Sequence, residues 1–190
     1  MIHQAIIRLA RSTALIGGFL LVALIIMTTV SIVGRSLGDI LHSDFAAHAL
    51  GGFAQGMRDL GLGEVKGSYE LLEAGVAFAI FSFFPICQLY TGHATVDVFT
   101  SRLPQALTRH LMAFWEVILT ACLILISVQL FGGVQRYYGN GETTLFLQFP
   151  LWWAYAASFA ASVVTCIVAV YCAIMRLCES VTGRSLLPQV

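Results

Sequence analysis

Long apolar stretches alternate with polar connections along the chain. A helix needs about 20 mostly apolar residues to cross a bilayer, and four stretches have that length: 13–34, 69–89, 110–131 and 150–175. Backbone groups in lipid must hydrogen-bond within the chain, so these stretches are expected to be helices. The pattern predicts an all-α membrane protein with four transmembrane helices, forming a single integral membrane domain over residues 1–190.

Composition places these helices in lipid rather than in a soluble core. Hydrophobic residues make up 58% of the 190 residues and charged residues only 11%, whereas soluble domains carry about 25% charged residues. The apolar run 13–33 is too long for a typical signal-peptide core, and no cleavage pattern follows, so we expect it to be retained as a helix. Basic and acidic residues balance, and charge gives no sign of nucleic-acid binding.

Basic residues predict the orientation of the chain, because they favour the cytoplasmic side. Both tails are basic, so we predict cytoplasmic N- and C-termini. The long first connection, 35–68 (loop 1), and the third connection, 132–149 (loop 3), are then periplasmic. Ser101 and Pro104 indicate an interfacial helical turn before the third span, which would enter the membrane near His110. Aromatic side chains suited to the outer headgroup level flank loop 3: Tyr137, Tyr138, Trp152, Trp153 and Tyr155.

Acidic side chains inside the spans are the first candidates for chemistry, since charge in lipid is costly. Glu116 lies about two turns inside the third stretch. It would either carry protons or, as we favour, pair across a helix interface or reach back to the headgroups. Glu70 and Glu73 share one face of the second helix. Arg35 closes the first helix on the same side, and an ion pair with one of these glutamates is expected to lower the cost of both charges.

Histidines and cysteines offer no cofactor site. Axial haem ligands lie within membrane spans, and only His110 touches a span, at its very end, which argues against a redox membrane anchor. His93 and Asp97, which follow Gly92, lack a third metal ligand and a nucleophile, so we favour a polar cap that fixes the turn after the second helix. No catalytic residue, metal ligand or cofactor is predicted.

The order of motifs resembles the small membrane subunit of tripartite ATP-independent periplasmic (TRAP) transporters, the DctQ-like family. The resemblance rests on Arg35 followed by SYELLEAGVAF (68–78), PICQLYTGHATVDVFTSRLP (85–104) and GETTLFLQFPLWWAYA (141–156). Ser31 stands where the family often has Asn, and loop 1 is longer than in many relatives. Besides Arg35, Glu70 and Glu73, the residues carried over as an assembly motif are Gly92, His93, Asp97, Gly141, Pro150, Trp152 and Tyr155.

The resemblance implies a non-enzymatic subunit of a bacterial inner-membrane system that imports carboxylates or related organic anions with a sodium gradient. A large elevator-type membrane subunit would hold the substrate and sodium sites, and a periplasmic binding protein would deliver the substrate. This chain would enlarge the stationary scaffold of the large subunit. Loops 1 and 3 are expected to help dock the binding protein, and membrane lipids are expected to surround the helices.

Small residues are the expected helix contacts, because they permit close approach in membranes. We expect some of a set in the first, second and fourth helices to face the large subunit: Gly17, Gly18, Ala74, Gly75, Ala157, Ala160 and Ala161. The alternative is a stand-alone four-helix carrier or channel that uses Glu116 as a proton or ion site.

Overall fold

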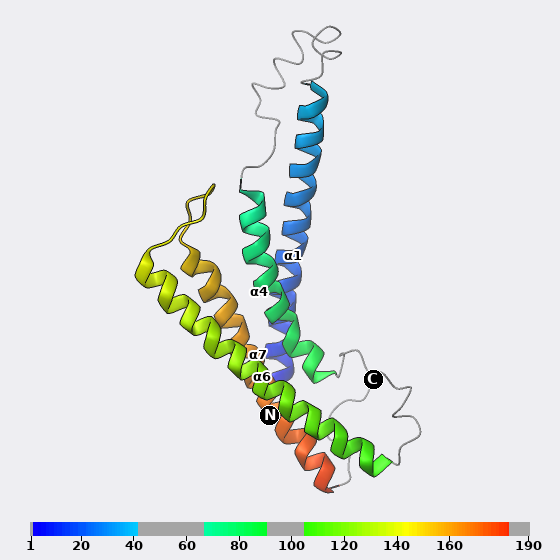
Figure 1. Cartoon of the computed structure of the whole chain (residues 1–190). Coiled ribbons are helices and arrows are strands. Elements are labelled where there is room, and N and C mark those ends of the chain that lie inside the picture. The colour runs from blue at the N-terminus through cyan, green and yellow to red at the C-terminus, as the bar shows by residue number, and fades with distance from the viewer. Residues whose placement is uncertain (1, 42–66, 91–104, 183–190) are drawn as a thin grey trace.

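Four helices form an open layer rather than a closed bundle (Figure 1). The computed structural model describes residues 2–41, 67–90 and 105–182. The helices are α1 (Ile2–Leu41), α4 (Ser68–Leu89), α6 (Gln105–Asn140) and α7 (Leu151–Thr182). All four are long and apolar enough to cross a membrane, which confirms the prediction of four spans.

Three helices are longer than their apolar stretches. Arg8 and Arg11 lie within α1, and Arg136 to Asn140 continue α6, because helical backbone bonds do not depend on side-chain polarity. Loop 3 is therefore 141–150, shorter than predicted. Arg176, which follows the predicted fourth span of 150–175, lies inside α7. The predicted start of the third helix near 103 falls beside the observed start at Gln105, and α6 continues without interruption past His110.

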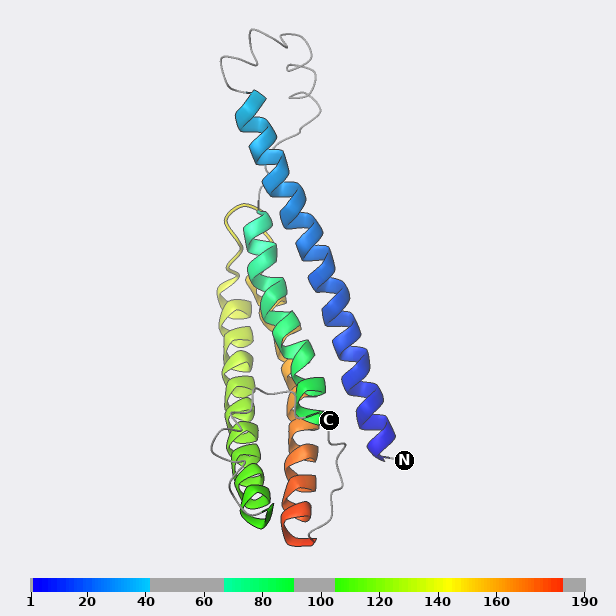
Figure 2. The ribbon, with the colours of Figure 1, turned by 90° about the vertical axis from the view of Figure 1, so that its right-hand side faces the viewer.

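The order of the layer is α6–α7–α4–α1. α6 packs along α7, α7 also packs on α4, and α4 carries α1, which touches α7 to a smaller extent. Figure 2 shows α1 standing apart from the α6–α7 pair, with α4 beside it. We call the end with loop 3 and the start of α4 the hairpin end. The opposite end, where α1 begins and α7 finishes, is the terminal end.

The buried core is small and lies towards the terminal end, where α1, α4 and α7 meet. Ala10, Leu89, Val168 and Cys172 form it. Most large apolar side chains point outwards instead; Phe19 of α1 is 80% exposed. This is the distribution expected of a protein whose solvent is lipid.

Glycines set the α1–α4 contact. A methyl group added at Gly17 would come within 2.6 Å of Ser82 Cβ, and one at Gly75 within 2.6 Å of Leu24 Cδ1. Ser31 and Ser68 add a hydroxyl–hydroxyl contact of 3.2 Å near the hairpin end. Gly17, Gly75 and the buried Ala161 therefore serve contacts within this chain. Of the small residues expected to face a partner, Ala157 and Ala160 are exposed.

Candidate functional site

The α6–α7 turn is a short hairpin loop closed by a single antiparallel bridge, and it carries part of the predicted assembly motif. Gly141 ends α6 in the left-handed conformation, with φ of 64°, and its amide donates to Tyr137 O at 3.1 Å. Glycine adopts this conformation without the steric cost that a Cβ imposes. Thr143 pairs with Pro150 in an antiparallel bridge, and α7 begins directly after this proline.

Aromatic side chains then join α6 to α7. The Tyr155 ring lies 4.7 Å from the Tyr137 ring, and Trp152 meets Tyr138 edge-on at 5.4 Å. Gly133 makes room for this contact, because a Cβ at that position would lie 2.7 Å from Tyr155 Cδ1. The Pro-x-Trp-x-x-Tyr pattern thus builds the start of α7 against the end of α6.

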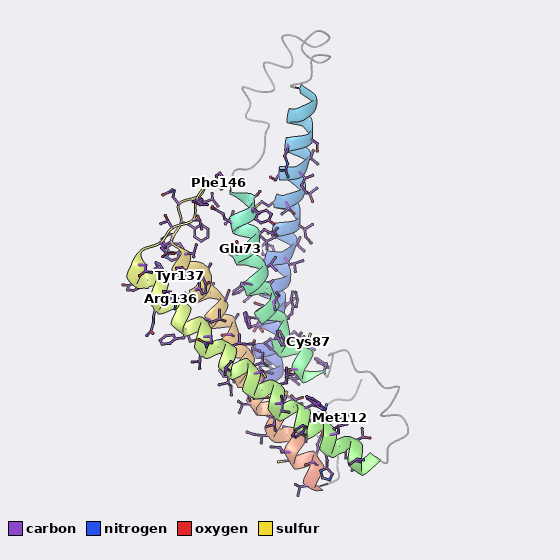
Figure 3. The ribbon with its side chains drawn as sticks, viewed as in Figure 1. Glu73, Cys87, Met112, Arg136, Tyr137 and Phe146 are labelled. Atoms are coloured by element: carbon purple, nitrogen blue, oxygen red, sulfur yellow. The ribbon has the colours of Figure 1, made fainter. Side chains whose placement is uncertain are left out.

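Glu70 ties this hairpin to the start of α4. Its two carboxylate oxygens accept the backbone amides of Phe146 and Leu147 at 2.8 and 3.0 Å. Gly67, with φ of 83°, precedes α4 and lies directly under the Leu147 side chain. Figure 3 shows Phe146 beside the start of α4. We predicted that one of Glu70 and Glu73 pairs with Arg35; the described contacts of Glu70 are hydrogen bonds to the hairpin backbone.

Arg35 and Glu73 lie at the same end. Arg35 is exposed and lines a shallow crevice between α1 and α4 together with Ser31, Ser68 and Tyr69. Glu73 is exposed on α4 and lies within electrostatic reach of the Tyr155 hydroxyl. An ion pair between Arg35 and Glu73 stays a prediction.

Pro85 creates a second tie, between α4 and α7. Proline has no amide hydrogen, so Pro85 cannot bond the carbonyl of Phe81 one turn earlier. Thr165 of α7 donates its hydroxyl to that carbonyl at 2.8 Å. Both Pro85 and Thr165 are buried. Sequence reasoning missed Thr165; its signal was Pro85 itself, because a proline within a span requires a donor from a neighbouring helix.

Small polar side chains line the seam between α6 and α7. Thr120 donates to Ala169 O at 3.3 Å, and the Cys166 thiol donates to Leu123 O at 3.6 Å. The hydroxyls of Ser127 and Ser162 lie 3.0 Å apart, and both residues are buried. Such contacts hold helices together in a bilayer. Lipid tails are as apolar as the side chains, so burying apolar side chains between helices gives no hydrophobic driving force.

Glu116 takes part in a third tie near the terminal end. Gln88 of α4, which is buried, donates its side-chain amide to a Glu116 carboxylate oxygen. Glu116 therefore binds across a helix interface, as we favoured. Further along α7, Arg176 and Glu179 form a buried ion pair of 3.0 Å, one turn apart. The Gln88–Glu116 contact positions α4 against α6, whereas the Arg176–Glu179 pair lies within α7.

Gly92, His93 and Asp97 lie outside the described residues, so the predicted polar cap stays a prediction. In the part of the chain that the structure describes, no group of three or more His, Cys, Asp and Glu residues could hold a metal ion. The described residues outline a shallow crevice between α1 and α4 and a shallow groove along α6. The described arrangement thus provides helix contacts and open surfaces.

Comparison with known proteins decides the family. The family model of tripartite ATP-independent periplasmic transporters, DctQ component, matches residues 54–179. The chain belongs to this family. No curated protein and no solved structure matches the sequence.

Membership establishes the general role of the chain. A DctQ component is the small membrane component of a TRAP transporter; it is a transporter component and not an enzyme, and it works with a large membrane subunit and a periplasmic binding protein. Together with its four apolar helices, this makes the chain a multi-pass protein of the inner membrane. The match begins after α1, so the family assignment rests on α4, α6, α7 and their connections.

Proposed function

We propose that this DctQ component enlarges the stationary scaffold of the large subunit in a sodium-driven importer of carboxylates or related organic anions. The proposal rests on three polar side chains within the four-helix layer, each of which is engaged in a hydrogen bond between elements of this chain. Glu70, Glu116 and Thr165 each tie α4 to the α6–α7 pair. A scaffold needs such fixed contacts, because the moving part of an elevator-type subunit carries the substrate across the membrane relative to a part that does not move. The sodium and substrate sites are assigned to the large subunit.

The groove along α6 is the face that we assign to the large subunit. Ala121, Ile124, Leu125, Val128 and Gln129 line it. Gln129 is exposed and lies 11 residues before the end of α6, about 16 Å along the helix axis. Gln129 belongs to the apolar stretch 110–131, close to the end of that stretch at the hairpin end. A primary amide exposed to lipid there is unfavourable without hydrogen-bond partners, which a helix of the large subunit would supply.

Substitutions along α6 test this face. Gly132 is exposed, and a side chain added there meets no atom of this chain within 4 Å. We expect Gly132→Trp and Leu125→Trp to reduce co-purification of the large subunit at least tenfold while the isolated chain stays folded. Ala160→Trp, at an exposed small residue of α7 that the sequence had led us to expect at the large subunit, tests that face separately. If only Ala160→Trp releases the large subunit, the contact lies on α7 instead.

The orientation and the binding-protein contact follow from the same proposal. We assign both termini to the cytoplasm, which places the hairpin end at the periplasm. Loops 1 and 3 would then take part in docking the binding protein.

Reconstitution tests the scaffold role. Vesicles that contain the large subunit and binding protein are compared with and without this chain, and sodium-dependent uptake of a labelled organic acid is measured. Uptake only with all three components is expected. The stand-alone carrier predicts uptake by this chain alone, abolished by Glu116→Gln; that result would refute the scaffold role.

A further inference from the structure

The tip of the hairpin exposes three consecutive apolar side chains. Leu145 is 86% exposed, Phe146 69% and Leu147 40%. These side chains do not serve the contacts that build the hairpin, which run through the backbone of Glu142, Thr144 and their partners. An exposed apolar cluster of this kind marks a site of contact with an apolar partner.

The length of α4 sets the depth of the tip. α4 has 22 residues, which is about 33 Å at 1.5 Å per residue, barely more than the hydrocarbon thickness of about 30 Å. To cross the bilayer, α4 must use nearly its whole length, so its first turn lies at the membrane boundary. Glu70 belongs to that turn and holds the amides of Phe146 and Leu147. The tip is therefore fixed at the boundary.

The backbone of the tip is prepared for an apolar environment. Free amides are strongly disfavoured in lipid, and the amides of Phe146 and Leu147 are both satisfied by the Glu70 carboxylate. The same two bonds stabilise the carboxylate of Glu70, which keeps its negative charge. The contact thus satisfies two backbone amides that would otherwise be unpaired next to acyl chains.

The tip also continues a belt of exposed aromatic side chains at the hairpin end. Tyr69 at the start of α4 is 79% exposed, Tyr138 near the end of α6 is 70% exposed, and Trp153 at the start of α7 is 60% exposed. Tyrosine and tryptophan concentrate at the headgroup level of membranes. Phe146 lies at the same end of the molecule (Figure 3). The chemistry shared by this belt is that of a lipid interface.

We propose that the hairpin tip, Leu145–Phe146–Leu147, is a lipid anchor that inserts into the boundary between headgroups and acyl chains. Glu70 and Gly67 position the tip, and the tip fixes the depth of α4 and of the α6–α7 hairpin together. The anchor does not depend on the proposed scaffold role.

Photo-crosslinking in the assembled transporter tests the anchor. p-Benzoylphenylalanine replaces Phe146, and the complex with its large subunit and binding protein is irradiated in membranes. Phospholipid adducts on this chain, identified by mass spectrometry, are expected in at least fivefold excess over those from the same reagent at Glu142. Adducts mainly to the large subunit or the binding protein would overturn the proposal, because the tip would then be a protein contact.

The isolated chain in vesicles of phosphatidylethanolamine and phosphatidylglycerol provides a second measurement. The photoreactive residue at Leu145 is expected to give phospholipid adducts there as well, and Glu70→Ala is expected to lower their yield several-fold by releasing the tip. An adduct yield at Leu145 no higher than at Glu142 would overturn the anchor, even if the chain is folded. Full uptake activity without the large subunit would refute the scaffold role and leave the anchor untouched.

Discussion

α7 and α1 are both long apolar helices, yet α7 lies inside the layer and α1 lies at its edge. In the most apolar window of α7, 44% of residues are buried within the chain, against 17% in α1. α7 makes a hydrogen bond to each of the other three helices, through Thr165 to α4, Ser162 to α6 and Tyr171 to His3 of α1. α1 rests mainly on α4.

The difference shows what organises helices in a membrane. Apolarity places both helices in lipid and does not distinguish them. Small and polar residues do: α7 carries Ser158, Ala161, Ser162, Thr165 and Ala169 among its buried positions, whereas α1 exposes Leu15, Phe19, Val22 and Ile26. Close approach and interhelical hydrogen bonds are the forces that remain when lipid tails match the side chains in apolarity.

Overpacking gives the largest expected contrast. Ala169 of α7 is fully buried, so Ala169→Leu forces α7 away from its neighbours and should destabilise the chain by about 1–3 kcal/mol or more. Ala23→Leu at an exposed position of α1 should have little effect. Thermal unfolding followed by size-exclusion chromatography compares the two variants. Equal midpoints would mean that α7 is not the central helix.

The threonine bond to Phe81 gives a smaller contrast. Thr165→Val removes the donor to a carbonyl that Pro85 leaves unpaired, and such contacts contribute about 0.6–1.7 kcal/mol in membranes. Thr29→Val in α1 loses only a bond to Ile25 O of its own helix and should be nearly neutral.

A double-mutant cycle isolates this contact. In a Pro85→Ala background the helix amide can bond Phe81 O again, so the cost of Thr165→Val should fall by at least half. The free energy of unfolding is measured for all four chains. Additive effects would show that Thr165 acts independently of the proline.

Glycine contacts give the smallest contrast. Gly133→Ala places a Cβ 2.7 Å from the Tyr155 ring, and Gly75→Ala places one 2.6 Å from the flexible end of Leu24. The ring is held by its contact with Tyr137, so we expect Gly133→Ala to lower the unfolding midpoint by a few degrees. Gly75→Ala should lie near zero, because Leu24 can shift and alanine gains about 1 kcal/mol of helix propensity. If Gly75→Ala lowered the unfolding midpoint more than Gly133→Ala, the α1–α4 contact would be the more rigid of the two.

Some residues of the candidate site were named from the sequence, whereas the contacts that they make were not. Gly141, Pro150, Trp152 and Tyr155, which the family resemblance supplied as part of an assembly motif, lie in and beside the α6–α7 hairpin, and their role in assembly stays a prediction. The hydrogen bonds of Glu70 were not predicted, because the amides of Phe146 and Leu147 come from a segment more than 70 residues away in the chain. No periodicity in the sequence reports such a contact.

The sequence by itself determined that four helices cross the membrane and which family the chain belongs to, since span length and motif order are local properties. Helix ends were less predictable, because polar residues such as Arg136 continue a helix as readily as apolar ones. Only the tertiary structure decided that α7 is central and α1 peripheral, and that Pro85 meets Thr165. The reason is physical: apolar side chains suit lipid and protein almost equally, so the layer order depends on a few small and polar residues that must meet across helices.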